Sequence, residues 1–149
     1  MTEKYLNRGV YIVALFSLLV LLVMIYWAFW PYKTLEMFTP IKILNPNKTV
    51  ANGVLEYEVD YKKFTNKSCT VSRVIIQQKG AIKTIYVLPT YISNAATGSA
   101  IVPMGLILPT NMQNGDNYRM IITFTYKVNY LRTIELEFSS ELFSIRNNP

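Results

Sequence analysis

One uninterrupted apolar run near the N-terminus constrains this chain more than any other feature. Residues 10–30 include a single aliphatic hydroxyl, Ser17, and contain no charged residue, proline or glycine. As a helix the run would be about 31 Å long at 1.5 Å per residue, close to the roughly 30 Å hydrocarbon core of a bilayer. Because a lone span must pair its own backbone groups in hydrocarbon, the run predicts one transmembrane α-helix.

The end of this run favours a permanent anchor over a cleaved signal peptide. A signal peptide has an apolar core of about 7–15 residues followed by small residues, whereas this run ends in bulky rings that prefer the headgroup layer. A buried helix of a soluble domain is disfavoured, because the rest of the chain has the pattern of β-structure and could not surround it. The residues expected to anchor the chain include Val10, Phe16, Leu22, Trp27 and Trp30.

The charges that flank the run barely discriminate between the two orientations. Lys4 and Arg8 precede it, and Lys33 and Lys42 follow it. A short tail before a long first apolar segment usually behaves as a signal-anchor, and a folding domain after it translocates largely regardless of charge. We therefore expect a single-pass protein of the cell membrane, with residues 1–9 as a short cytoplasmic tail and a periplasmic or extracellular C-terminal domain.

The segment after the anchor, residues 31–48, contains three prolines among mixed polar and apolar residues. Proline cannot continue a helix, so we expect an extended stem here, in which "FTPIKIL" could form a first edge strand. Residues 49–149 are expected to form the domain proper.

Short runs with β-strand periodicity recur through residues 49–149. From Leu55 to Tyr61 apolar residues alternate with acidic ones, and from Tyr118 to Val128 every second residue is apolar. About seven such runs, with turn signals at intervals of roughly ten residues, are typical of an antiparallel β-sandwich. The expected fold class is therefore all-β, an antiparallel sandwich of about seven strands preceded by one transmembrane α-helix.

The turn before the clearest strand carries a family resemblance. In "MQNGDNYRMIITF" Met112 stands six positions before Tyr118, a spacing that resembles the tyrosine corner of immunoglobulin-like and fibronectin type III domains. The resemblance implies a membrane-anchored immunoglobulin-like sandwich in which Tyr118 starts the next-to-last strand and its hydroxyl bonds back to the turn. It implies structural roles for both residues and nothing about function. The chain departs from antibody domains in lacking a cysteine pair and a core tryptophan.

The composition argues against an enzyme. The chain has no histidine, which removes the usual general base, the Ser-His-Asp and Cys-His systems and the usual zinc sites. Cys69 is the single cysteine and cannot form a redox pair. Glu56, Glu58 and Asp60 share a strand face, but alternate residues lie about 6.6 Å apart, so a solvated face is favoured over a calcium site. We expect no catalytic residues, no cofactor and no metal.

The charge balance is mildly basic beyond the anchor. Residues 31–149 carry 13 Lys and Arg against 8 Asp and Glu, without a run of like charge. Lys62, Lys63 and Lys67 cluster in one expected turn, and Lys79 and Lys83 in another. Solvated loops are the favoured interpretation and nucleic acid is not an expected partner, whereas contact with anionic headgroups or wall polymers is a minor alternative.

These features together predict a non-catalytic accessory or scaffolding subunit. Its expected partners are the lipid bilayer and a protein of a membrane complex, and an oligomer is left open. The alternatives are a phage- or host-encoded envelope effector, for lysis or superinfection exclusion, and a binder of cell-envelope polymers. Abundant Lys, Asn, Ile and Tyr indicate an AT-rich genome such as that of a bacterium or a phage.

Overall fold

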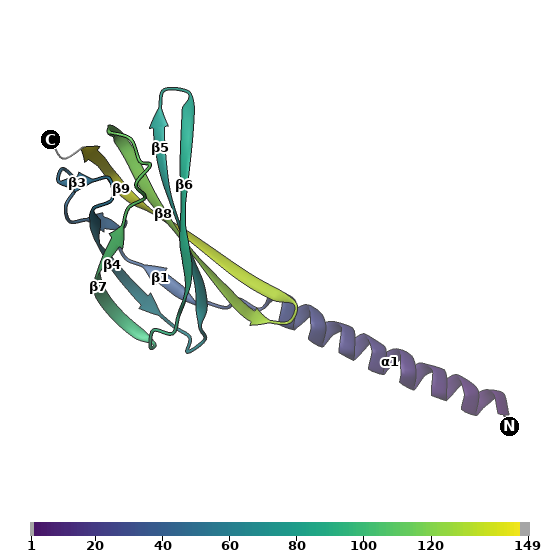
Figure 1. The fold of residues 1–149 in the computed structure, drawn as a ribbon. Helices are drawn as coiled ribbons and strands as arrows, with labels where there is room; N and C mark the ends of the chain where they lie inside the picture. The colour runs from purple at the N-terminus through teal and green to yellow at the C-terminus, as the bar shows by residue number, and fades with distance from the viewer. Residues whose placement is uncertain (1, 147–149) are drawn as a thin grey trace. The chain divides into compact units, whose positions relative to one another are not determined.

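The chain divides into two compact units, Met1–Tyr32 and Lys33–Pro149, and the computed structural model describes residues 2–146 (Figure 1). The first unit contains helix α1 (Thr2–Phe29). Its segment Arg8–Phe29 is long and apolar enough to cross a membrane, and none of it is buried against protein. The expected anchor residues are each more than half exposed: Val10, Phe16, Leu22, Trp27 and Trp30.

Helix α1 ends just before the first proline of the chain. The Trp30 N–H still donates to the Tyr26 carbonyl oxygen over 2.8 Å, and the two rings lie 4.6 Å apart. Pro31 then prevents another helical turn, since its ring clashes with the preceding turn and it has no N–H to donate.

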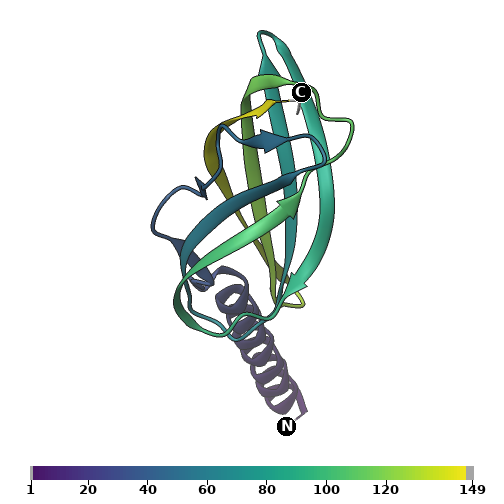
Figure 2. The same cartoon turned by 60° about the vertical axis from the view of Figure 1, so that its left-hand side comes forward.

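The second unit is mostly β-structure. Its strands are β1 (Leu35–Met37), β2 (Lys42–Ile43), β3 (Thr49–Val50), β4 (Val54–Lys63), β5 (Cys69–Lys79), β6 (Ile82–Ser93), β7 (Gly98–Ile107), β8 (Gly115–Asn129) and β9 (Arg132–Arg146). In the smaller sheet β4 lies between β7 on one side and β1 and β2 on the other. The larger sheet has the order β3-β9-β8-β5-β6. Figure 2 shows the smaller sheet in front of the larger one.

The expectation of a purely antiparallel arrangement is wrong at one edge. Strand β3 pairs parallel with β9, and Ile41 forms an isolated parallel bridge to Ser140. The reason is that one segment, residues 41–50, passes from the edge of the smaller sheet to the edge of the larger one. It runs in the same direction as β9, so it can pair with β9 only in parallel.

The core lies between the two sheets and follows the predicted alternation. Strand β4 contributes Leu55, Tyr57 and Val59, each at most 2% exposed, while its acidic residues lie on the outer face. Strand β8 contributes four inward side chains in the same way: Tyr118, Met120, Ile122 and Tyr126. Residues in a strand alternate between faces, so the pattern in the sequence was sufficient to orient both strands.

Part of the expected stem belongs to the domain. Strands β1 and β2 pair with β4, and Leu35, Ile41 and Ile43 are buried in the core. The Asn45 side chain donates to the Val54 carbonyl oxygen over 2.8 Å and accepts the Glu56 N–H over 2.9 Å. The expected boundary at residue 49 is therefore too late, because the apolar residues of this segment complete the core beside β4.

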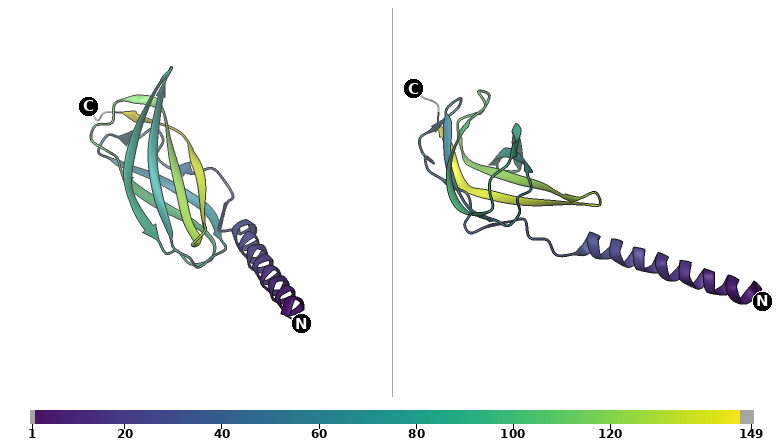
Figure 3. Two further views of the ribbon diagram at one scale, coloured as in Figure 1. Left: turned by 90° about the vertical axis from the view of Figure 1, so that its right-hand side faces the viewer. Right: turned by 90° about the horizontal axis from the view of Figure 1, so that it is seen from below.

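The two long hairpins turn at opposite ends of the domain, as Figure 3 (left) shows. In the β5–β6 turn Lys79 pairs with Ile82, and Gly80 has a φ of 60°, which glycine adopts without steric cost. In the β8–β9 turn Asn129 pairs with Arg132. Leu35, the first residue of β1, pairs with Lys63 at the end of β4. Strand β5 starts shortly afterwards beside the end of β8, where Thr70 pairs with Thr125. The domain therefore begins at the same end as the β8–β9 turn.

Candidate docking face

The two residues of the expected tyrosine corner are buried in the fold. Tyr118 is 0% exposed and Met112 is 4% exposed. The Tyr118 hydroxyl donates to the Gln113 carbonyl oxygen over 2.6 Å, and its ring lies 5.8 Å from that of Phe143. Burial, and then the neighbouring Tyr86, raise the pKa of Tyr118 to about 12. Both residues support the turn before β8 and offer no surface to a ligand.

Residues of the types that carry metal or redox chemistry are not gathered in one place. Among the described residues, no group of three or more Cys, Asp and Glu could hold a metal ion. Cys69 is a buried free thiol at the start of β5. The acidic residues of β4 lie on the outer face of the smaller sheet, where Glu58 stands opposite Lys42 of β2.

The outer face of the larger sheet is unusually apolar. Strand β6 turns Tyr86 and Leu88 into the core, while its neighbours Ile85 and Val87 are 54% and 76% exposed. A sheet face in water normally carries polar residues at the outward positions. Here these positions carry branched aliphatic side chains.

The same face continues across the neighbouring strands. The register aligns Val74 of β5 with Val87 of β6 on one side and with Ile121 of β8 on the other. It likewise aligns Ile76 with Ile85. We define the aliphatic face by its six side chains: Val74, Ile76, Ile85, Val87, Ile121 and Leu142. Contiguous exposed apolar patches are typical of surfaces that bind another molecule.

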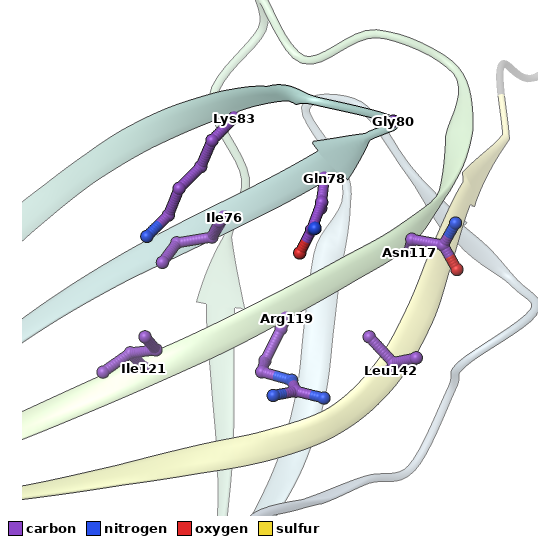
Figure 4. Close-up of a pocket in the computed structure, with 8 residues that line it drawn as sticks. All are labelled: Ile76, Gln78, Gly80, Lys83, Asn117, Arg119, Ile121 and Leu142. Atoms are coloured by element: carbon purple, nitrogen blue, oxygen red, sulfur yellow. The ribbon is translucent and has the colours of Figure 1, made fainter.

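An open hollow of about 520 Å³ lies at one end of the aliphatic face. Figure 4 shows that residues from four neighbouring strands line it, with Ile76, Ile121 and Leu142 on the same side of the sheet as two cationic side chains. Those cations are Lys83 and Arg119. The hollow thus combines an aliphatic floor with positive charge.

The two cations of the hollow have no acidic partner in the part of the chain that the structure describes. The salt bridges Lys33–Glu36 and Asp116–Arg146 both lie outside the hollow. A complementary ligand would bring carboxylates to Lys83 and Arg119 and aliphatic groups to the floor. Such charge complementarity fixes the orientation of a partner more than it adds affinity.

The sequence matches no known protein-family model, and it matches no curated protein.

The aliphatic face had a signal in the sequence that alternation alone does not reveal. In "RVIIQQ" and "IYVLP" apolar residues occupy consecutive positions, so both faces of the strand become apolar. Consecutive apolar residues are typical of strands covered on both sides. One side of β5 and β6 faces the core, and the other carries the aliphatic face.

Proposed function

We propose that the second unit is an immunoglobulin-like sandwich. In that fold two strands called B and E neighbour each other in one sheet, and strands C, F and G form the other, to which variable-type domains add C′. Strands β4 and β7 correspond to B and E. Strands β6, β5, β8 and β9 follow the order C′-C-F-G. The bond from Tyr118 to Gln113 at the start of β8 also supports this proposal, since it lies where the tyrosine corner of the fold does.

The chain is a non-catalytic, single-pass membrane protein that presents this domain outside the membrane to a protein partner. The aliphatic face of the larger sheet is the observation that carries the proposal. Helix α1 supports the membrane part, with the N-terminus in the cytoplasm. The absence of histidine from the sequence supports a docking role over catalysis.

The partner carries aliphatic side chains next to carboxylates. Its aliphatic groups cover Ile76, Ile85 and Val87, and its carboxylates face Lys83 and Arg119. Confinement of both proteins to one membrane raises their effective concentration, so that a contact of modest affinity is sufficient.

Co-purification of the full-length chain with its partner in mild detergent tests this function. The informative variant is Ile85→Lys with Val87→Lys, which places two charges on the aliphatic face. The matched control is Ile101→Lys with Ile107→Lys, on β7 at the outer face of the smaller sheet, where the exposures of 63% and 70% are similar. All four side chains lie on edge strands.

We expect the first variant to reduce the yield of a stoichiometric partner about tenfold or more, corresponding to about 1.4 kcal/mol or more of lost binding energy. The control should retain the partner. Equal yields from the two variants would contradict docking at the aliphatic face. Recovery of a second copy of this chain alone would replace the separate partner with a homodimer.

A further inference from the structure

Two lysines lie close to the exposed Phe64 ring, at the end of the domain where the chain enters it from the anchor. The Lys33 and Lys62 ammonium nitrogens lie 4.7 Å and 5.2 Å from the centre of the Phe64 ring. The Phe64 N–H donates to the Thr34 carbonyl oxygen over 2.9 Å. These contacts join the first residues of the domain and the β4–β5 loop into one surface.

The β8–β9 hairpin adds to that surface. The Lys67 ammonium group donates to the Val128 carbonyl oxygen, which ties the β4–β5 loop to the hairpin. At its turn Tyr130 is 96% exposed and Leu131 is 59% exposed. The Lys127 ammonium nitrogen lies 5.6 Å from the centre of the Tyr130 ring.

The hairpin also projects beyond its neighbour in the sheet. The pairing of β5 with β8 ends at Thr70 and Thr125, whereas β8 and β9 remain paired with each other as far as Asn129 and Arg132. Figure 3 (right) shows the hairpin extending past the other strands of the domain. Its two exposed turn residues therefore stand at the extremity of this end.

We define the basic end by five cationic and three apolar side chains: Lys33, Lys62, Lys67, Lys127, Arg132, Phe64, Tyr130 and Leu131. Lys33 also pairs with Glu36 over 2.8 Å, which offsets part of its charge. The composition of the basic end fits the surface of an anionic bilayer. Lysine and arginine bury their stems at such a surface while their charges meet phosphate, and each is attracted to anionic lipid. Tyrosine prefers the headgroup layer, where its ring is covered and its hydroxyl stays wet.

The covalent structure brings this end to the membrane. Only residues 30–34 separate the last residue of α1 from the first residue of β1, and so short a segment spans about 20 Å at most. The start of β1, and Lys63 which pairs with it, are therefore tethered within about 20 Å of the last residue of α1. A soluble acidic protein would have to compete with a lipid surface that is always present.

We propose that the basic end binds the headgroups of anionic lipids, with Tyr130 and Leu131 in the headgroup layer. This inference rests on α1 spanning the membrane, and it is independent of the aliphatic face. Lipid contact at this end restrains the tilt of the domain above the bilayer. The restricted tilt of the domain then limits the orientations in which the aliphatic face can meet a partner in the same membrane.

The opposite end of the domain supplies an internal control. The β5–β6 turn also carries an exposed aliphatic residue between lysines, since Ile82 is 70% exposed and lies between Lys79 and Lys83. Its composition resembles that of the basic end, but no anchor is attached there. Composition alone would predict lipid contact at both turns, whereas the proposal predicts it only at the β8–β9 turn.

The test uses the full-length chain reconstituted into phosphatidylcholine vesicles, with or without phosphatidylglycerol. Leu131→Cys and Ile82→Cys each carry an environment-sensitive fluorophore, and the wild type serves as the labelling blank because Cys69 is buried. We expect the label at position 131 to shift to the blue and to be quenched by brominated lipid several-fold more than the label at position 82. The difference should appear with phosphatidylglycerol and weaken at high salt.

A second pair of variants separates charge from composition. Lys62→Gln with Lys127→Gln, in the Leu131→Cys background, should lower the quenching several-fold. Lys42→Gln with Lys48→Gln removes two exposed lysines away from the basic end and should leave it unchanged.

Each remaining outcome has a definite meaning. Equal quenching at positions 131 and 82, or none at position 131 in anionic vesicles, overturns the proposal. Trp27 and Trp30 report insertion of α1 in the same samples. If brominated lipid does not quench their emission, α1 does not span the membrane. The proposed lipid contact, which rests on that span, is then contradicted as well.

Discussion

The Tyr118 hydroxyl donates a 2.6 Å hydrogen bond to the Gln113 carbonyl oxygen, five residues earlier in the chain. The bond ties the segment between β7 and β8 to the first buried position of β8. The ring itself is fully buried, with the ring of Tyr86 at 6.3 Å and that of Phe143 at 5.8 Å. One side chain thus fixes both the turn and the end of the core.

Tyr118→Phe should therefore lower stability while leaving the packing intact. The change removes one hydroxyl and its bond to Gln113, so we expect the free energy of unfolding to fall by about 0.5–1.5 kcal/mol. The midpoint of urea unfolding would report this at an unchanged slope. Tyr130→Phe is the control, because the Tyr130 side chain is 96% exposed. Equal midpoints for Tyr118→Phe and the wild type would contradict a stabilising role for the bond.

The same residue predicts how stability depends on alkaline pH. Burial, and then Tyr86, raise the pKa of Tyr118 from 10.0 to about 12. Because the folded state holds the proton more tightly, this contribution is fully present below pH 10 and is lost as the pH rises through about 12. Thermal midpoints measured across this range should fall more steeply in the wild type than in Tyr118→Phe.

Two further tyrosines should make the thermal midpoint of Tyr118→Phe fall with alkaline pH as well. Burial, followed by the adjacent Cys69, raises the pKa of Tyr126. Burial, followed by Tyr57, raises the pKa of Tyr91. The comparison therefore measures the difference between two slopes, and identical slopes would show that Tyr118 titrates equally in the folded and unfolded chains.

The parts of the fold that depend on neighbouring residues could be read from the sequence. The alternation around Leu55 and Tyr118 placed the correct side chains in the core, because the period of a strand is a local property. The apolar run of residues 10–30 gave a helix for the same kind of reason. The Lys79-Gly80 turn was also marked locally, by a glycine that tolerates positive φ.

Features that depend on distant partners could not be read in this way. Strand β3 has two residues, Thr49 and Val50, and nothing in them specifies parallel pairing with β9, almost a hundred positions later. Pro40 and Pro46 correctly indicated that no helix forms here. They did not indicate that the residues between them complete the core. The consecutive apolar residues of β5 and β6 indicate a second apolar side on each strand, but the aliphatic face as a whole depends on the register that aligns β5, β6 and β8.

Two adjacent residues of β6 should separate stability from docking. Leu88 is 4% exposed in the core, whereas Val87 is 76% exposed on the aliphatic face. Leu88→Ala should cost about 2–5 kcal/mol, from lost burial and the cavity left behind. Val87→Ala should cost about 1 kcal/mol or less, within the range of strand propensities. Urea unfolding measures both, and a larger cost at Val87 than at Leu88 would reverse the assigned faces.

Removal of the anchor should leave a folded domain only if the segment after it is kept. Residues 33–149 retain β1, β2 and the Asn45 side chain with its hydrogen bonds to Val54 and Glu56, whereas residues 49–149 lack all three. The shorter fragment also loses Leu35, Ile41 and Ile43, whose exposures are 7%, 0% and 4%. Truncating a buried aliphatic residue to alanine costs about 2–5 kcal/mol. Loss of all three is therefore comparable to the 5–15 kcal/mol of an ordinary domain.

We accordingly expect residues 33–149 to unfold cooperatively in urea and residues 49–149 to lack a cooperative transition. Near-ultraviolet circular dichroism would show the same contrast, because the buried tyrosines lose their fixed surroundings when the core opens. Within residues 33–149, Ile41→Ala should shift the midpoint, since Ile41 is fully buried and bridges to Ser140 on β9. Phe38→Ala should shift the midpoint less, because that ring is 51% exposed. A cooperative transition in residues 49–149 at the midpoint of the longer fragment would mean that the smaller sheet needs no strand beside β4 other than β7.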